Sequence, residues 1–170
     1  MNIFFLDRSA TLAAQYHCDK HVVAMVRETA QILSTAHRVL DPDQCDENFY
    51  RKTHVNHPSS AWARGSMSQY VWTWKLLVNL CKEYTARYNK VHAVEKKGML
   101  TTLARVPKPL LEADDSWVDP PQCMPDRLKG SFAVLAYRRY YVEEKIRFAK
   151  WKNGPPHWWP LTQTRGSHGE

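Results

Sequence analysis

The sequence predicts an all-α fold with three principal helices and a long proline-rich irregular segment. Residues 10–40 contain neither proline nor glycine and are rich in helix-forming residues. In residues 67–89, apolar and aromatic side chains recur at steps of three and four: Tyr70, Trp74, Leu77, Cys81, Tyr84 and Tyr88. Residues 132–151 carry two apolar stripes, which indicates a helix with contacts on two sides.

Capping residues and prolines set the expected ends of these helices. The expected caps are Asp7 or Ser9 for the first helix, Ser66 with Gln69 for the second, and Ser131 for the third. Pro42 cannot continue a helix, so the first one should end near residue 40.

The remaining stretches are interpreted as connections. Residues 3–6 are apolar and are expected to lie extended against the core. Ser59 or Ser60 can cap a short helical turn over residues 61–64. Residues 90–106 are at best weakly helical, and the prolines of 107–130 exclude a regular helix there. The adjacent Trp158 and Trp159 should pack back onto the body, because exposing both is costly.

Composition limits the class of protein. The length of 170 residues favours one domain, expected over residues 1–160 with a disordered tail at 161–170. A net charge of +7 with seven Trp and eight Tyr favours nucleic acid or a nucleotide as the partner. No pattern of a membrane span, a signal peptide or a disulfide framework is present, so the expected location is the cytoplasm.

Histidines are concentrated in residues 17–57. In a helix, His17, His21 and Glu28 would share one narrow stripe at the edge of the apolar face. His54 and His57 follow in a loop that could close over that stripe. These five residues form the predicted catalytic site. The alternative is a boundary stripe of partly exposed side chains.

Two kinds of chemistry suit these residues. Neutral imidazoles can move protons or contact phosphate near neutral pH, while Glu28 could activate water or stabilise a developing cation. His17, His21, His54 and His57 could instead bind a divalent metal such as Zn²⁺. The residue order matches no metalloprotease signature, because the His-Glu-x-x-His order is absent.

Other polar side chains are expected to contact the substrate or its phosphates: Lys20, Asn56, Arg64, Arg87 and Asp126. An arginine can bind phosphate with two parallel hydrogen bonds. Tyr137 and Tyr140 could stack on a ligand or form hydrogen bonds, and a place in the core suits them equally.

Four runs together resemble a family of small, mostly uncharacterised tailed-phage proteins: residues 13–23 (AAQYHCDKHVV), 53–58 (THVNHP), 83–88 (EYTARY) and 123–126 (CMPD). The resemblance extends over about residues 1–160. It implies a phage-encoded protein that acts in the host cytoplasm.

The chain also resembles the small, basic, all-helical phage pyrimidine-dimer DNA glycosylase/lyases. Those enzymes carry a Gln-His pair early in the first long helix and a catalytic Glu, for which Gln15, His17 and Glu28 are the nearest positions. In that family the nucleophile is the amine of the second residue, exposed after Met removal. Here Asn2 follows Met1, and Met is poorly removed before Asn. Lys20 is the alternative amine.

Three functions therefore stand as hypotheses. The first is an enzyme acting on DNA or nucleotides with glycosylase/lyase-like chemistry at the His/Glu site. The second is a metal-dependent phosphodiesterase or nuclease that uses the clustered histidines. The third is a non-enzymatic protein that binds a nucleotide or a host factor.

Overall fold

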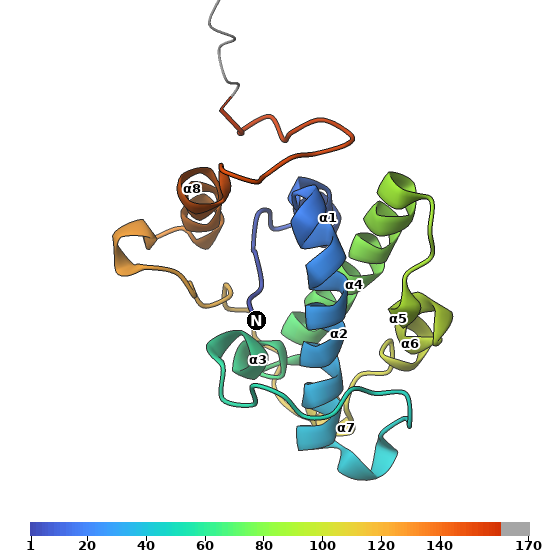
Figure 1. Ribbon diagram of the computed structural model, residues 1–170. Coiled ribbons are helices and arrows are strands. Elements are labelled where there is room, and N and C mark those ends of the chain that lie inside the picture. The colour runs from blue at the N-terminus through green and yellow to red at the C-terminus, as the bar shows by residue number, and fades with distance from the viewer. Residues whose placement is uncertain (161–170) are drawn as a thin grey trace, which may run out of the picture.

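The computed structural model describes residues 1–160, and every regular element in that part is a helix, as predicted (Figure 1). The long helices are α2 (Asp19–Leu40), α4 (Met67–Tyr88) and α8 (Ala133–Lys145). The shorter elements are α1 (Ala10–Tyr16), η1 (Pro42–Gln44), α3 (Pro58–Ala63), α5 (Ala93–Lys96), α6 (Met99–Thr102), α7 (Lys108–Glu112) and η2 (Asp126–Leu128). Within residues 1–160, no helix is long and apolar enough to cross a membrane. The predicted tail at 161–170 lies outside the described residues.

The core lies between α2 and α4, which pack along each other. Val22, Val26 and Leu33 of α2 are fully buried, as are Leu76, Leu77 and Leu80 of α4. Residues 3–6 form no helix and are buried against the core, as predicted, although the Leu6 N–H donates to the Phe4 carbonyl at 2.9 Å in a tight turn. In Figure 1 this segment runs between α8 on one side and α1 and α2 on the other.

The prediction of one helix over residues 10–40 is wrong, because the chain is extended at His17 and Cys18. The cause is a buried arginine from α4. The guanidinium of Arg87 donates to the carbonyl oxygens of Gln15 and His17 at 2.9 and 2.7 Å. The Asp19 backbone N–H donates to the Lys150 carbonyl at 2.8 Å. Tertiary partners thus replace the helical hydrogen bonds at the break.

Several expected helix ends are confirmed. The Ser9 hydroxyl accepts from the Leu12 N–H, and the Ser66 hydroxyl accepts from the Gln69 N–H. The short helix near residue 60 is capped differently, since α3 begins at Pro58 and His57 Nδ1 accepts from the Ser59 N–H.

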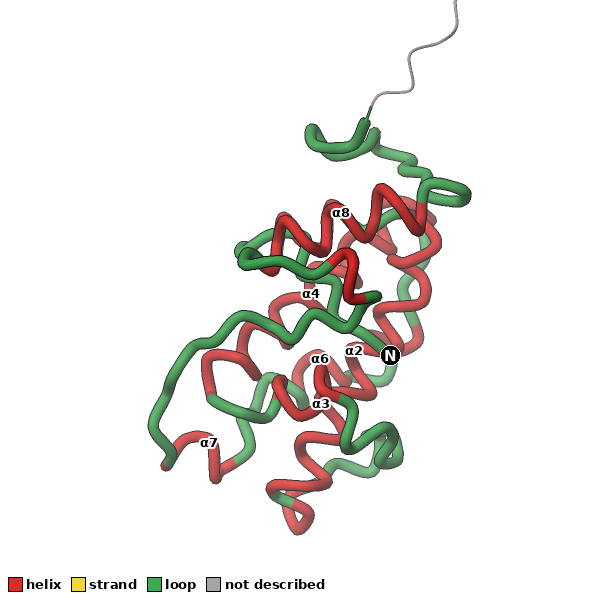
Figure 2. The backbone as a smooth tube through the Cα atoms, turned by 90° about the vertical axis from the view of Figure 1, so that its left-hand side faces the viewer, coloured by secondary structure: helices red, strands yellow, loops and turns green. Residues whose placement is uncertain are grey.

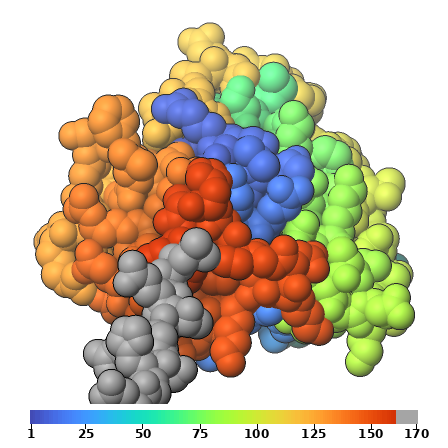
Figure 3. All heavy atoms as spheres, turned by 90° about the horizontal axis from the view of Figure 1, so that it is seen from above, coloured from blue at the N-terminus to red at the C-terminus, as the bar shows by residue number. Residues whose placement is uncertain are grey.

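The third helix is shorter than predicted and has no serine cap. Phe132 is its N-cap residue, no side chain caps it, and it ends at Lys145 rather than near 151. Beyond Lys145 the chain turns towards α1, where the Trp151 indole N–H donates to the Tyr16 carbonyl at 3.0 Å. Trp158 and Trp159 pack on the body as predicted, with Trp158 edge-on to Tyr16. Seen from above, this last described segment lies against the amino-terminal part of the chain and overlaps some of it (Figure 3).

The proline-rich stretch is irregular for most of its length. One short helix, α7, does form inside it, because Pro109 lies in the first turn, where a missing N–H costs nothing. After α7 the chain runs along the molecule to η2 (Figure 2). It thereby carries Cys123 to the amino-terminal residues.

Candidate active site

The Asn2 side chain anchors the start of the chain. Its Nδ2 donates to the Cys123 carbonyl at 2.9 Å, and its Oδ1 accepts from the Ile3 N–H at 2.8 Å. The hydroxyl groups of Tyr137 and Ser59 lie 3.0 and 3.5 Å from the same Oδ1. A short polar residue at the chain end is therefore tied to α3, to α8 and to the loop before η2.

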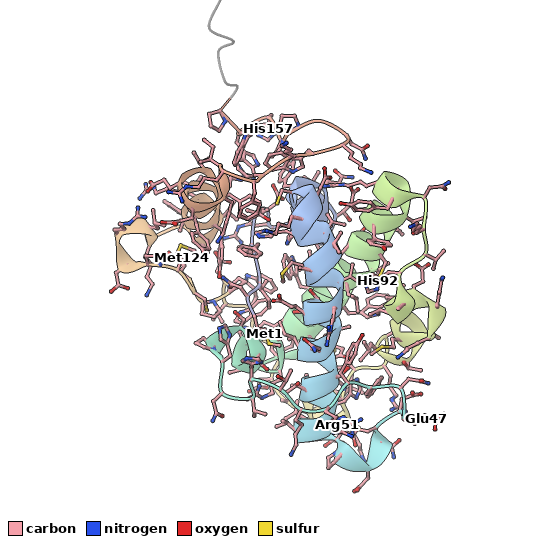
Figure 4. All side chains as sticks on the ribbon, in the orientation of Figure 1. Met1, Glu47, Arg51, His92, Met124 and His157 are labelled. Atoms are coloured by element: carbon pink, nitrogen blue, oxygen red, sulfur yellow. The ribbon has the colours of Figure 1, made fainter. Side chains whose placement is uncertain are left out.

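The amino group of Met1 lies beside a carboxylate of α2. Its nitrogen is 3.7 Å from Glu28 Oε2, and the Glu28 side chain is 34% exposed. Figure 4 shows Met1 on the same side of α2 as Met124, with His92 on the other side. An amine and a solvent-accessible carboxylate therefore face each other at the side of α2.

These two groups open into a cavity of about 460 Å³ between α2, the amino-terminal segment and α8. Its walls include Phe4, Lys20, His21 and Tyr140. Phe4 stacks on the His21 ring at 4.5 Å between centroids. The cavity therefore joins aromatic surface to two amines and one carboxylate.

His21 is held as a neutral imidazole at the edge of this cavity. Burial, reinforced by the positive charges of His17, Lys145 and Lys20, lowers the pKa of His21 to about 3. The Tyr141 hydroxyl contacts its Nδ1. A neutral ring can bind a polar substrate, but it does not titrate near neutral pH.

His57 lies close to the amino group as well. Burial, followed by the positive charge of the amino terminus, lowers the pKa of His57. Its Nδ1 accepts from the Ser59 N–H as the cap of α3, and the residue lines a second, larger cavity of about 630 Å³. Cys123 lines both cavities.

The sequence model of the pyrimidine dimer DNA glycosylase family matches residues 1–96. The chain belongs to that family. Membership implies a DNA glycosylase, with DNA as the substrate. Searches of curated proteins and of solved structures find no match. The matched region contains Met1, His21, Glu28 and His57, whereas Cys123, Tyr140 and Tyr141 come from outside it.

In this glycosylase-family chain, His17 is not part of the cavity. The break before α2 turns its ring inward, where Nδ1 lies 2.6 Å from the Ala13 carbonyl oxygen. Burial lowers the pKa of His17 to about 4. The expected single stripe of His17, His21 and Glu28 is therefore reduced to the last two residues.

The four histidines do not form the alternative metal site. Residues 1–160 contain no group of three or more His, Cys, Asp or Glu side chains placed to hold a metal ion. His17 faces the core, His21 contacts Tyr141, and His57 caps α3. His54 is exposed, with a left-handed backbone and a hydrogen bond to Thr53 Oγ1 at 2.7 Å.

Of the five expected substrate contacts, only Lys20 lines the cavity. Arg87 is 5% exposed and is paired with Asp19 and Glu83, so it is not available to a phosphate. Arg64 donates to the Val55 carbonyl at 2.7 Å and braces the loop that carries Asn56, which is exposed. Asp126 is exposed and paired with Lys129 at 2.7 Å.

Reasoning from the sequence missed Asn2, Cys123 and Tyr141 as parts of the site. Asn2 and Cys123 entered the sequence analysis only through the two resemblances, and the contacts that place all three residues join segments distant in the chain. The resemblance to the glycosylase/lyases did point to the amino terminus, although to the amine of residue 2 rather than that of Met1.

Proposed function

We propose that this protein is a DNA glycosylase/lyase that acts on pyrimidine dimers, with the Met1 amino group as nucleophile and Glu28 as the catalytic carboxylate. The 3.7 Å distance between Met1 N and Glu28 Oε2 is the observation that carries the proposal. Membership of the pyrimidine dimer DNA glycosylase family supports it.

The arrangement suits an attack by the amine on the sugar. The neutral amine would bond to C1′ of the damaged nucleotide while the C1′–N bond breaks, and the electron pair would leave with the base, which takes up a proton. The amine would pass its own proton to Glu28, which lies within reach. Ring opening then yields an imine, and loss of a C2′ proton expels the 3′ phosphate.

Glu28 has a second role in this scheme. Positive charge develops on the sugar as the C1′–N bond weakens, and a carboxylate beside it lowers the energy of that state. The aromatic surface of Phe4 and Tyr140 would border the nucleotide that enters the cavity. Neutral His21 would contribute hydrogen bonding rather than proton transfer at neutral pH.

Lys20 is the second amine in the same cavity. Its Nζ lies over the Phe148 ring, 4.7 Å from the centroid. Because this position is exposed and lies at the cavity wall, we assign Lys20 to phosphate binding and not to imine formation.

The test is borohydride trapping on duplexes that contain one cyclobutane pyrimidine dimer or one abasic site. Intact mass first establishes which residue begins the purified chain. The expected result is a covalent adduct that maps to the tryptic peptide of residues 1–8. An adduct on the peptide that contains Lys20 would move the nucleophile there and overturn the role of Met1. Tight binding to the damaged duplex with neither adduct nor strand cleavage would indicate a binding protein and overturn the whole proposal.

A further inference from the structure

Part of the proposed reaction centre comes from outside the region matched by the family. The family match ends at residue 96, yet the loop before η2 and the helix α8 both contact Asn2. Within α8, Tyr137 is fully buried, and it points at the Asn2 side chain rather than at the cavity. Its role therefore differs from that of Tyr140, which lines the cavity.

The Tyr137 hydroxyl is surrounded by fixed partners. It lies 2.6 Å from the Pro121 carbonyl oxygen and 3.0 Å from Asn2 Oδ1, and it accepts from the Cys123 N–H at 3.3 Å. Burial raises the pKa of Tyr137, so the group stays a proton donor throughout the physiological range. One hydroxyl thus joins α8, the proline-rich stretch and the chain start.

These contacts restrain the backbone next to the Met1 amine. Asn2 is the residue that follows Met1, so whatever fixes its side chain limits the rotation of the backbone between the amine and the rest of the chain. The Asn2 side chain contacts Cys123, in the loop before η2, and Tyr137 of α8. Glu28, which the Met1 amine faces, belongs to a different element, α2. The amine is therefore presented to Glu28 by groups that do not touch it.

We infer that Tyr137 is a positioning residue, which acts through Asn2 to hold the Met1 amino group at Glu28. This inference rests on the proposed function. Orientation of a nucleophile contributes to the rate of the covalent step and not to the affinity for substrate, because the restrained group makes no new contact with the bound DNA. The hydroxyl should therefore affect the chemical step alone.

The test compares Tyr137→Phe, Asn2→Leu and the double variant. Leu at position 2 has a similar volume without hydrogen-bonding groups, and intact mass verifies that Met1 is kept. The measured quantities are the single-turnover rate of borohydride trapping on an abasic duplex and the dissociation constant for a duplex with a tetrahydrofuran abasic analogue. We expect trapping to slow about tenfold in Tyr137→Phe, with affinity within about twofold of wild type.

The double variant separates positioning from general destabilisation. If Tyr137 acts through Asn2, adding Tyr137→Phe to Asn2→Leu should slow trapping no further than Asn2→Leu does alone. The matched control is Tyr70→Phe. It removes an equally buried hydroxyl, which bonds to the Leu103 carbonyl and to His37 at 2.9 and 2.8 Å, and its ring does not line the cavity. Tyr70→Phe should lower stability and leave trapping unchanged.

Wild-type trapping rates in Tyr137→Phe would overturn the inference while leaving the proposed function intact. The inference also fails if Tyr70→Phe slows trapping equally, or if the effects of Tyr137→Phe and Asn2→Leu multiply. A wild-type protein that forms no adduct would overturn both proposals. Should Tyr137→Phe fail to fold, the test rests on Asn2→Leu. An unchanged trapping rate in Asn2→Leu would overturn the inference. A tenfold slower trapping rate at unchanged DNA affinity would support it.

Discussion

The Tyr141 hydroxyl contacts Nδ1 of His21 and so joins α8 to the face of α2 that carries Glu28. Tyr141 is fully buried, and burial keeps its pKa well above the usual range. The hydroxyl is therefore always protonated, whereas His21 has its pKa lowered to about 3. The pair behaves as a neutral hydrogen-bonded unit.

His21 should consequently show no titration near neutral pH. The unfolded chain would protonate this ring below about pH 6.5, and the folded chain only near pH 3, so acid shifts the equilibrium towards unfolding through that interval. The ring nitrogen shifts in NMR spectra should stay constant between pH 5 and 8. A titration midpoint between pH 6 and 7 for His21 would contradict this prediction and restore a proton-shuttle role.

Glu28→Gln tests the carboxylate. The substitution keeps the size and hydrogen-bonding reach but removes the charge beside the Met1 amine. We expect base release and strand cleavage on dimer-containing duplex to fall by at least about 100-fold, with duplex affinity retained. Glu112→Gln is the matched control, because this exposed carboxylate of α7 lies away from the cavity lining. Equal activity of the two variants would eliminate Glu28 from the reaction.

Lys20→Ala separates phosphate binding from imine formation. If Lys20 contacts one phosphate, the slope of log K against log salt concentration should become less steep by about 0.9, and trapping at saturating DNA should persist. Lys96→Ala serves as the control, since α5 lies on the side of α2 away from α8 (Figure 1). Loss of the adduct in Lys20→Ala would instead make Lys20 the nucleophile.

Arg87→Met should destabilise the fold rather than the interaction with DNA. The substitution leaves the Asp19 and Glu83 carboxylates and two carbonyl oxygens without their buried donor. The free energy of unfolding in urea should fall by about 3–5 kcal/mol. Arg8→Met, which removes an exposed partner of Asp119, should change it by less than about 0.5 kcal/mol. A stable Arg87→Met protein with weakened DNA binding would restore the predicted phosphate contact.

Local patterns predicted much of the helical framework. The α4 helix and its Ser66 cap follow from contacts within a few residues. Helical spacing also predicts a broad apolar face that includes Val22, Val23 and Val26; Val22 and Val26 are buried, whereas Val23 is exposed. The position of Glu28 two turns after His21 needed only helical geometry. These features depend on interactions between residues close in the chain, so local patterns are enough to predict them.

Local sequence patterns could not predict the amino-terminal site, because contacts between distant residues form it. Asn2 and Tyr137 lie 135 residues apart, and Arg87 reaches 70 residues back to His17 to end α1. Whether Arg87 binds a phosphate or a pair of carbonyl groups depends on what surrounds it after folding, and not on its neighbours in the chain.

Helix periodicity alone was enough to predict an all-α protein in which His21 and Glu28 share one face of a long helix, although the same stripe was expected to include His17. Folding brings the Met1 amine to Glu28, turns the His17 ring inward and places α8 against the amino-terminal residues. Those outcomes depend on hydrogen bonds and burial between distant segments, which exist only once the chain is packed.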